Sequence, residues 1–202
     1  PQDNLYGYYK LNPPVRDLLK QFLTEYRGKL IAHKADYDFK VLIYTLFMKN
    51  ASDHVGMIDA IDLLHPKIED SLLVSFCALN STEDYKLGLK ALAHEFAGNY
   101  GQENINDVRK IPLQQLLTYN LKDTLCTWYV YKKYYPVLEQ DNQTYYYEEI
   151  LLKSLKVVLE MSIWGLPVLP TDISKAEAEL TKLLQAEIEL LKTEERFISR
   201  QL

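Results

Sequence analysis

The stretch KLIAHKADYDFKVL, at residues 29–42, is the part of the sequence that best defines the fold. Its first five residues are typical of a short strand, and a helix is predicted to follow over about 37–48. Because this helix is apolar on most of its faces, we expect it to lie deep in a core. Asp36 and Asp38 stand where the strand ends and the helix begins.

An amphipathic helix is predicted before this stretch. It opens at Asn12-Pro13-Pro14, where asparagine is a capping residue and prolines are tolerated in the first turn, and it closes at Gly28. Apolar side chains recur at helical spacing between these ends: Val15, Leu18, Leu19, Phe22, Leu23 and Tyr26.

After the stretch, GMIDAIDLL at residues 56–64 predicts a second strand, and Asp70 is predicted to cap a helix that ends at about Leu79. A polar loop is predicted at 80–86, then a helix over 87–96 that stops at Gly98. An aperiodic polar stretch at 99–110 precedes a long helix, predicted to run from Pro112 to just before Pro136. This order of strands and helices places the chain in the α/β class.

The last third of the sequence is predicted to be helical. One helix spans about 143–164, and a second, amphipathic helix begins at a capping box formed by Ser174 and Glu177. The segment PVLPTD, at residues 167–172, is the best candidate boundary between them. We therefore expect a body at 1–168 and a helical extension at 169–202.

Composition restricts the class of protein. Of the 202 residues, 48% are hydrophobic and 25% are charged, which is typical of a globular protein, and the net charge is −5. A stand-alone module that binds duplex DNA tightly is usually basic, so the acidic balance argues against one. No apolar run is long enough to span a bilayer, and the N-terminus lacks the pattern of a signal peptide. Because the two cysteines also lack metal-type spacing, we expect a cytoplasmic protein with reduced thiols and no membrane partner.

Tyr119 and Asp123 form the sharpest polar pattern, because residues four apart on a helix share a face. An aspartate can bind a divalent cation, and a phenol one turn away can orient a water molecule. Leu117, Leu121, Leu125 and Trp128 are predicted to form a different, apolar face. The same pair is also typical of a tyrosine at the rim of a core beside a solvated aspartate. Asp38, likewise, can be a metal ligand or only part of the first turn of its helix.

Together these motifs resemble the 3′–5′ exonuclease domain of family A DNA polymerases, in bacteria and phages. Residues 30–42 resemble its second exonuclease motif, and 119–123 resemble its third motif in the tyrosine-containing variety. Between them lie DSLL at 70–73 and LGLKALA at 87–93, in the order typical of the family. The stretch LKVVLEMSIWGLPV, at 155–168, resembles the end of the domain before the polymerase thumb. The resemblance covers about residues 15–168.

The resemblance implies an RNase H-like fold that uses two Mg²⁺ or Mn²⁺ ions, held by four carboxylates, to hydrolyse the 3′ end of single-stranded DNA. Asp123 would bind the ion on the nucleophile side, Asp38 would serve the leaving-group ion, and Tyr119 would hold the attacking water. No other cofactor is implied. The partners would be the DNA end and the upstream and polymerase regions of the same chain. A phage protein would act in the host cytoplasm.

Two features depart from the family pattern. No aspartate in the sequence is followed two residues later by glutamate, so the Asp-x-Glu pair of the first motif is absent. We interpret this absence as an N-terminal truncation, and we expect the fragment alone to be inactive. Lys34 also stands where the family usually has asparagine, and its ammonium could compete with a metal near Asp38.

Two further interpretations stay open. The tyrosine-type third motif is shared with free-standing RNase D-like exonucleases. Lys34 and the missing acidic pair favour a non-catalytic, exonuclease-like scaffold domain of a polymerase. The residues that precede Pro1 and follow Leu202 would distinguish these possibilities.

Overall fold

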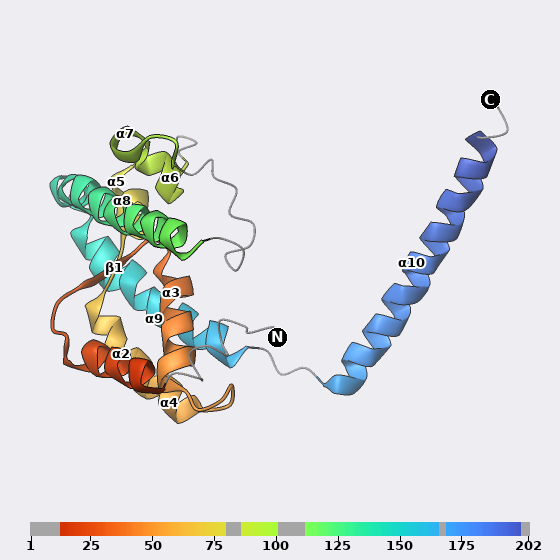
Figure 1. Ribbon diagram of the computed structural model, residues 1–202, viewed down its shortest axis with the longest axis horizontal. Helices are drawn as coiled ribbons and strands as arrows, with labels where there is room; N and C mark the ends of the chain where they lie inside the picture. Colours follow the sequence, from red (N-terminus) through yellow and green to blue (C-terminus); the bar gives the residue numbers. More distant parts are fainter. Residues whose placement is uncertain (1–12, 80–85, 101–111, 166–168, 199–202) are drawn as a thin grey trace. The chain divides into compact units, whose positions relative to one another are not determined.

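The computed structural model describes residues 13–79, 86–100, 112–165 and 169–198. The chain divides into two compact units, Pro1–Trp164 and Gly165–Leu202, and each is described by itself. In chain order the helices and strands of the first unit (Figure 1) are α2 (Pro13–Glu25), β1 (Leu30–Ala32), α3 (Ala35–Leu42), a π-helix (Ile43–Phe47), α4 (His54–Leu64), a 3-10 helix (His65–Lys67), β2 (Ile68–Asp70), α5 (Ser71–Ala78), α6 (Leu89–Leu92), α7 (His94–Ala97), α8 (Leu113–Gln140), a second π-helix (Tyr146–Leu151) and α9 (Leu152–Trp164).

The sheet of the described residues consists of β1 and β2, which are parallel and paired with Ala32 opposite Asp70. β2 is buried along its whole length, whereas all three residues of β1 are half-buried. The unit is therefore mostly helical with a small parallel sheet, which is compatible with the predicted α/β class. The carboxyl ends of both strands meet at one edge, where α3 and α5 begin.

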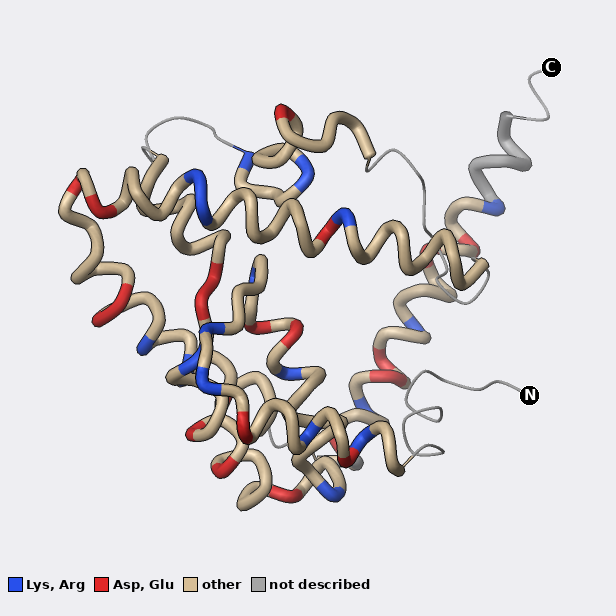
Figure 2. The backbone as a smooth tube through the Cα atoms, turned by 60° about the vertical axis from the view of Figure 1, so that its left-hand side comes forward, with Lys and Arg blue, Asp and Glu red and all other residues tan. Residues whose placement is uncertain are grey.

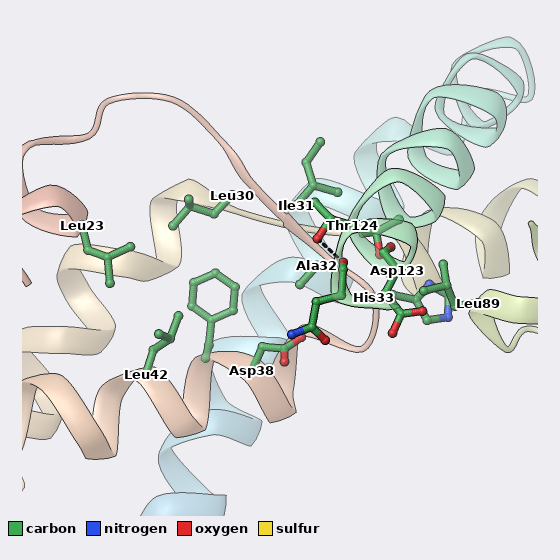
Figure 3. A pocket seen from close by; sticks show the side chains of 13 residues that line it. Leu23, Leu30, Ile31, Ala32, His33, Asp38, Leu42, Leu89, Asp123 and Thr124 are labelled. Atoms are coloured by element: carbon green, nitrogen blue, oxygen red, sulfur yellow. Dashed lines mark hydrogen bonds between the residues drawn. The ribbon is translucent and has the colours of Figure 1, made fainter. Parts of the chain in front are cut away.

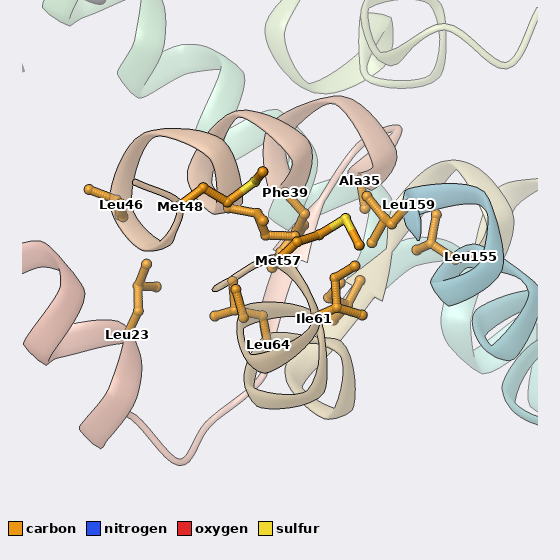
Figure 4. Close-up of a cluster of buried hydrophobic side chains, with 13 residues drawn as sticks. Leu23, Ala35, Phe39, Leu46, Met48, Met57, Ile61, Leu64, Leu155 and Leu159 are labelled. Atoms are coloured by element: carbon orange, nitrogen blue, oxygen red, sulfur yellow. The ribbon is translucent and has the colours of Figure 1, made fainter. Parts of the chain in front are cut away.

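The main hydrophobic core lies between α3, α4 and α9 (Figure 4). Its fully buried side chains include Ile43, Met57, Ile61, Leu64 and Leu159. Each such side chain contributes roughly 1.5–3 kcal/mol when it leaves water. The predicted deep burial of the helix after β1 is confirmed for Phe39 and Ile43, which are 2% and 0% exposed.

The prediction of a strand at 56–64 is wrong, because this segment lies in α4. Asp53 caps the helix, and its carboxylate accepts a hydrogen bond of 3.0 Å from the N–H of Gly56. The buried residues Met57, Ile61 and Leu64 follow a helical period instead. The second strand is instead Ile68–Asp70, directly before α5.

The prediction that the long helix ends before Pro136 is also wrong, since α8 continues to Gln140 with Pro136 inside it. A proline within a helix removes one backbone hydrogen bond and costs about 3 kcal/mol. Packing offsets this cost, because α8 lies along α5 and Leu138, just past the proline, is fully buried against Val74 and Tyr147.

Several predicted boundaries are confirmed and one is not. The helix before Gly28, the strand within 29–33 and the Asp70 cap are all present. The single helix predicted at 87–96 is instead the pair α6 and α7, which ends at Gly98 as expected. The predicted loops at 80–86 and 99–110 fall largely outside the described residues.

The second unit contains α10 (Pro170–Ile198). The N–H groups of Asp172 and Ile173 both bond to Leu169 O, so the helix begins at Pro170. Ser174 lies inside α10, and the predicted start at a capping box is wrong. The first helical position suits a proline, which lacks the N–H that would be unpaired there. Residues 167 and 168, the first two of the predicted boundary segment, are not described.

Charge is mixed along the described chain. Lysine and arginine are interspersed with aspartate and glutamate along the tube (Figure 2). Within the same residues, no helix is both long enough and apolar enough to cross a membrane.

Candidate functional site

A cavity of about 630 Å³ lies beside β1 and is bounded by β1, α3 and α8. Asp38 from α3 and Asp123 from α8 both extend into it, although 85 residues separate them in the sequence (Figure 3). The remaining lining residues are mostly apolar or neutral: Leu23, Leu30, Ile31, Ala32, His33, Phe39, Leu42, Leu89, Asn120, Thr124 and Thr127. The cavity therefore offers two carboxylates beside mostly apolar walls. It is partly open to solvent, and Asp38 itself is exposed.

Asp38 lies in the first turn of α3, where the partial positive charge of the helix N-terminus favours a carboxylate. The pKa of Asp38 is nevertheless raised above its usual value. Partial withdrawal of the carboxyl from water is the largest cause, and the negative charges of Asp70 and Asp36 add to it. A cation in the cavity would relieve this repulsion.

Asp70, at the end of β2, determines where α3 begins. Its carboxylate accepts hydrogen bonds from the N–H of Lys34 at 3.0 Å, of Ala35 at 2.8 Å and of Leu72 at 2.9 Å. Lys34 itself has a φ of 66°, a left-handed conformation that asparagine and glycine adopt more readily than lysine. One buried carboxylate thus links both strand ends and places Asp38 one turn into α3.

Asp123 accepts a hydrogen bond from Tyr100, which is not among the residues that line the cavity. The Tyr100 hydroxyl donates to Oδ1 of Asp123 at 2.8 Å, and the tyrosine is only 9% exposed. Burial first, then the neighbouring Cys126 and Asp123, raise the pKa of Tyr100, so its hydroxyl keeps its proton and acts as a donor. The sequence analysis did not single out Tyr100, because it lies 23 residues before Asp123 in an aperiodic stretch.

Tyr119 does not line the cavity. It packs at the rim of a second hydrophobic cluster, whose buried residues include Tyr100, Cys126 and Val130. The ammonium of Lys90 lies 5.1 Å from the centre of its ring. The side of α8 that carries Tyr119 packs on this cluster. The leucines predicted to form an apolar face of the helix are instead exposed to solvent, Leu117 at 53% and Leu121 at 60%. The structure therefore places Asp38 and Asp123 at the same cavity. Tyr119 lies at the rim of a hydrophobic cluster, which is the alternative to a role in metal binding.

His33 is the other polar residue at the carboxyl end of β1, and sequence reasoning assigned it no role. Its Nδ1 lies 2.9 Å from Ser71 Oγ, and its Nε2 lies 3.0 Å from Leu87 O. Burial lowers the pKa of His33, against the raising effects of Asp70 and of the bond to Leu87. The imidazole anchors the segment before α6 to the end of the sheet and forms part of the cavity wall.

The polar side chains that line the cavity offer the type of ligand that Mg²⁺ and Mn²⁺ bind. These hard cations prefer carboxylate, amide and hydroxyl oxygens. The number of strong ligands is small. Within the described ranges, no group of three histidine, cysteine, aspartate or glutamate side chains is placed to hold a metal ion. Asp38 and Asp123 thus form part of a possible metal site, and further ligands would be needed for two ions.

Comparison of the chain with protein-family models, with curated proteins and with solved structures finds no match in any of the three.

Proposed function

We propose that this chain is part of the 3′–5′ proofreading exonuclease domain of a family A DNA polymerase, with an RNase H-like fold. One observation carries the proposal. Asp38 and Asp123, which belong to the second and third motifs of the resemblance, line the same cavity at the carboxyl end of β1. Two carboxylates of distant sequence origin that line one cavity are typical of a metal-dependent phosphodiester hydrolase.

The chain contributes two of the four carboxylates that such a site requires. Asp38 and Asp123 would each bind a divalent cation, which when bound supplies charge stabilisation at the phosphate and activates water. Asp70 bonds the first turn of α3, which carries Asp38, and Tyr100 donates a hydrogen bond to Asp123. Leu30, Phe39 and Leu42 form the apolar part of the cavity wall. Tyr119, expected to hold a water, faces the second hydrophobic cluster and has no role in this proposal.

The test starts with the coding sequence on either side of this chain. We expect a strand with Asp-x-Glu before Pro1 and polymerase sequence after Leu202. The extended chain should then shorten a 5′-labelled single-stranded DNA from its 3′ end in Mg²⁺, and Asp123→Ala should abolish the activity. Efficient hydrolysis of RNA in place of DNA would favour an RNase D-like enzyme.

A non-catalytic scaffold domain is the second candidate. It is favoured by the small number of metal ligands among the described residues. An extended chain without an upstream acidic pair and without hydrolysis of either nucleic acid would support the scaffold and overturn the exonuclease.

A further inference from the structure

Tyr100 donates a half-buried hydrogen bond to Asp123, one of the two aspartates that line the cavity. Tyr100 belongs to the second hydrophobic cluster with Leu92, Ala93, Cys126 and Val130. Its ring packs in the same cluster as Cys126 and Val130 of α8, and its hydroxyl donates to Oδ1 of Asp123 at 2.8 Å. Oδ2 of Asp123 accepts no hydrogen bond from the residues that the structure describes.

The approach of Tyr100 to α8 depends on two local features. Gly98, between α7 and Tyr100, has a φ of 63°, a conformation that side chains other than glycine rarely adopt. The Lys90 ammonium lies 5.8 Å from the ring centre of Tyr100 and 5.1 Å from that of Tyr119, so one cation covers both rings. The chain turn and the cation together fix the phenol beside Asp123.

We propose that Tyr100 is a positioning residue, which holds Oδ1 of Asp123 and thereby presents Oδ2 to a divalent cation in the cavity. The inference rests on the proposed function. The physical reason is that a carboxylate fixed by a buried donor does not lose rotational freedom when it binds a metal, whereas a free carboxylate does. Residues that orient a metal ligand in this way commonly change metal affinity by about 10- to 100-fold when removed.

The experiment is a calorimetric Mn²⁺ titration of the wild-type chain and of Tyr100→Phe, Asp123→Asn and the double variant. Phenylalanine keeps the ring in its cluster and removes only the hydroxyl. We expect Tyr100→Phe to weaken Mn²⁺ binding by about 10-fold, and to have no further effect when Asp123 is already asparagine. Tyr135→Phe is the matched control. It deletes a 3.1 Å bond from a tyrosine of α8 to Glu148, away from the cavity, and should leave the affinity unchanged.

The outcomes separate this inference from the proposed function. If Asp123→Asn loses Mn²⁺ binding while Tyr100→Phe binds Mn²⁺ with wild-type affinity, the positioning role alone is overturned. This holds even if the melting temperature of Tyr100→Phe is lower than that of the wild type. Equal Mn²⁺ affinity in wild type and Asp123→Asn would overturn both. If Tyr100→Phe does not fold, wild-type NMR decides. Bound Mn²⁺ should broaden the Tyr100 ring signals more than those of Tyr135, and equal broadening would contradict the inference.

Discussion

Oδ2 of Asp70 accepts a hydrogen bond of 2.8 Å from the backbone N–H of Ala35, and this bond joins the end of β2 to the first turn of α3. The same carboxylate accepts from the N–H groups of Lys34 and Leu72. Because Asp38 lies one turn beyond Ala35, the place of a candidate metal ligand depends on a side chain that never touches the cavity.

Asp70→Asn should destabilise the fold strongly. The amide replaces one acceptor oxygen with a donor, which leaves at least one buried backbone N–H without a partner. Asp70 is only 3% exposed, so water cannot restore the bond. We expect the free energy of unfolding to fall by about 3 kcal/mol in urea denaturation.

Asp53→Asn is the matched control for this prediction. Asp53 also accepts two backbone N–H groups, at 2.8 Å from Lys49 and 3.0 Å from Gly56, but nearer the solvent. Because asparagine caps a helix about as well as aspartate, Asp53→Asn should destabilise the fold much less than Asp70→Asn. Similar costs at both positions would contradict the special role of Asp70.

Lys34→Asn should stabilise the chain. Lys34 has a φ of 66°, and asparagine tolerates this left-handed region better than lysine, by about 0.5–1 kcal/mol. Lys34→Ala removes the same charge without this conformational benefit and should not be stabilised. Thermal unfolding of the two variants measures the difference, and equal melting temperatures would exclude the backbone explanation.

The same pair of variants tests the expected competition between Lys34 and a metal. Lys34 is exposed, forms no salt bridge with a described residue and is not among the groups that shift the pKa of Asp38. We therefore expect both variants to bind Mn²⁺ with an affinity within about twofold of wild type, instead of the larger gain that sequence alone suggests. A tenfold gain in both would show that the ammonium reaches the site.

Asp38→Asn should stabilise the folded chain at neutral pH. The pKa of Asp38 is raised on folding, so the folded state binds this proton more tightly, and ionisation of the carboxyl opposes folding. At pH 7 the gain should stay below about 1 kcal/mol, because the exposed carboxyl is screened by water. The gain should shrink as the pH falls and vanish below the usual aspartate pKa of 3.8. Urea denaturation at several pH values measures it, and a gain that grows on acidification would contradict the assignment.

The 202-residue chain by itself should not hydrolyse single-stranded DNA at a measurable rate. Two-metal catalysis needs both ions in place, and Asp38 and Asp123 provide too few ligands. A fluorescent oligonucleotide with Mg²⁺ or Mn²⁺ tests this expectation. Shortening from the 3′ end that disappears in Asp123→Ala would overturn it.

Local chemistry predicted much of the site, and its limits are visible at particular residues. Asp38 and Asp123 were identified from motif spacing, and the structure places both at one cavity. Tyr119 was paired with Asp123 because they share a helix face, but residues four apart still differ by about 40° around the helix axis. That difference suffices for Tyr119 to enter the second hydrophobic cluster while Asp123 reaches the cavity.

The sequence by itself determined the elements with strong local signals. Pro13 begins α2, apolar residues make β1, and Asp70 caps α5, because each signal acts within a few residues of the backbone that it controls. Only the tertiary structure decided the rest. Burial against its neighbours made 56–64 a helix and carried α8 past Pro136, while contacts of Asp70 and Tyr100 across the fold oriented α3 and Asp123. The hydrogen-bond partners in these contacts lie 23 to 36 residues apart in the sequence, so no local sequence pattern can predict them.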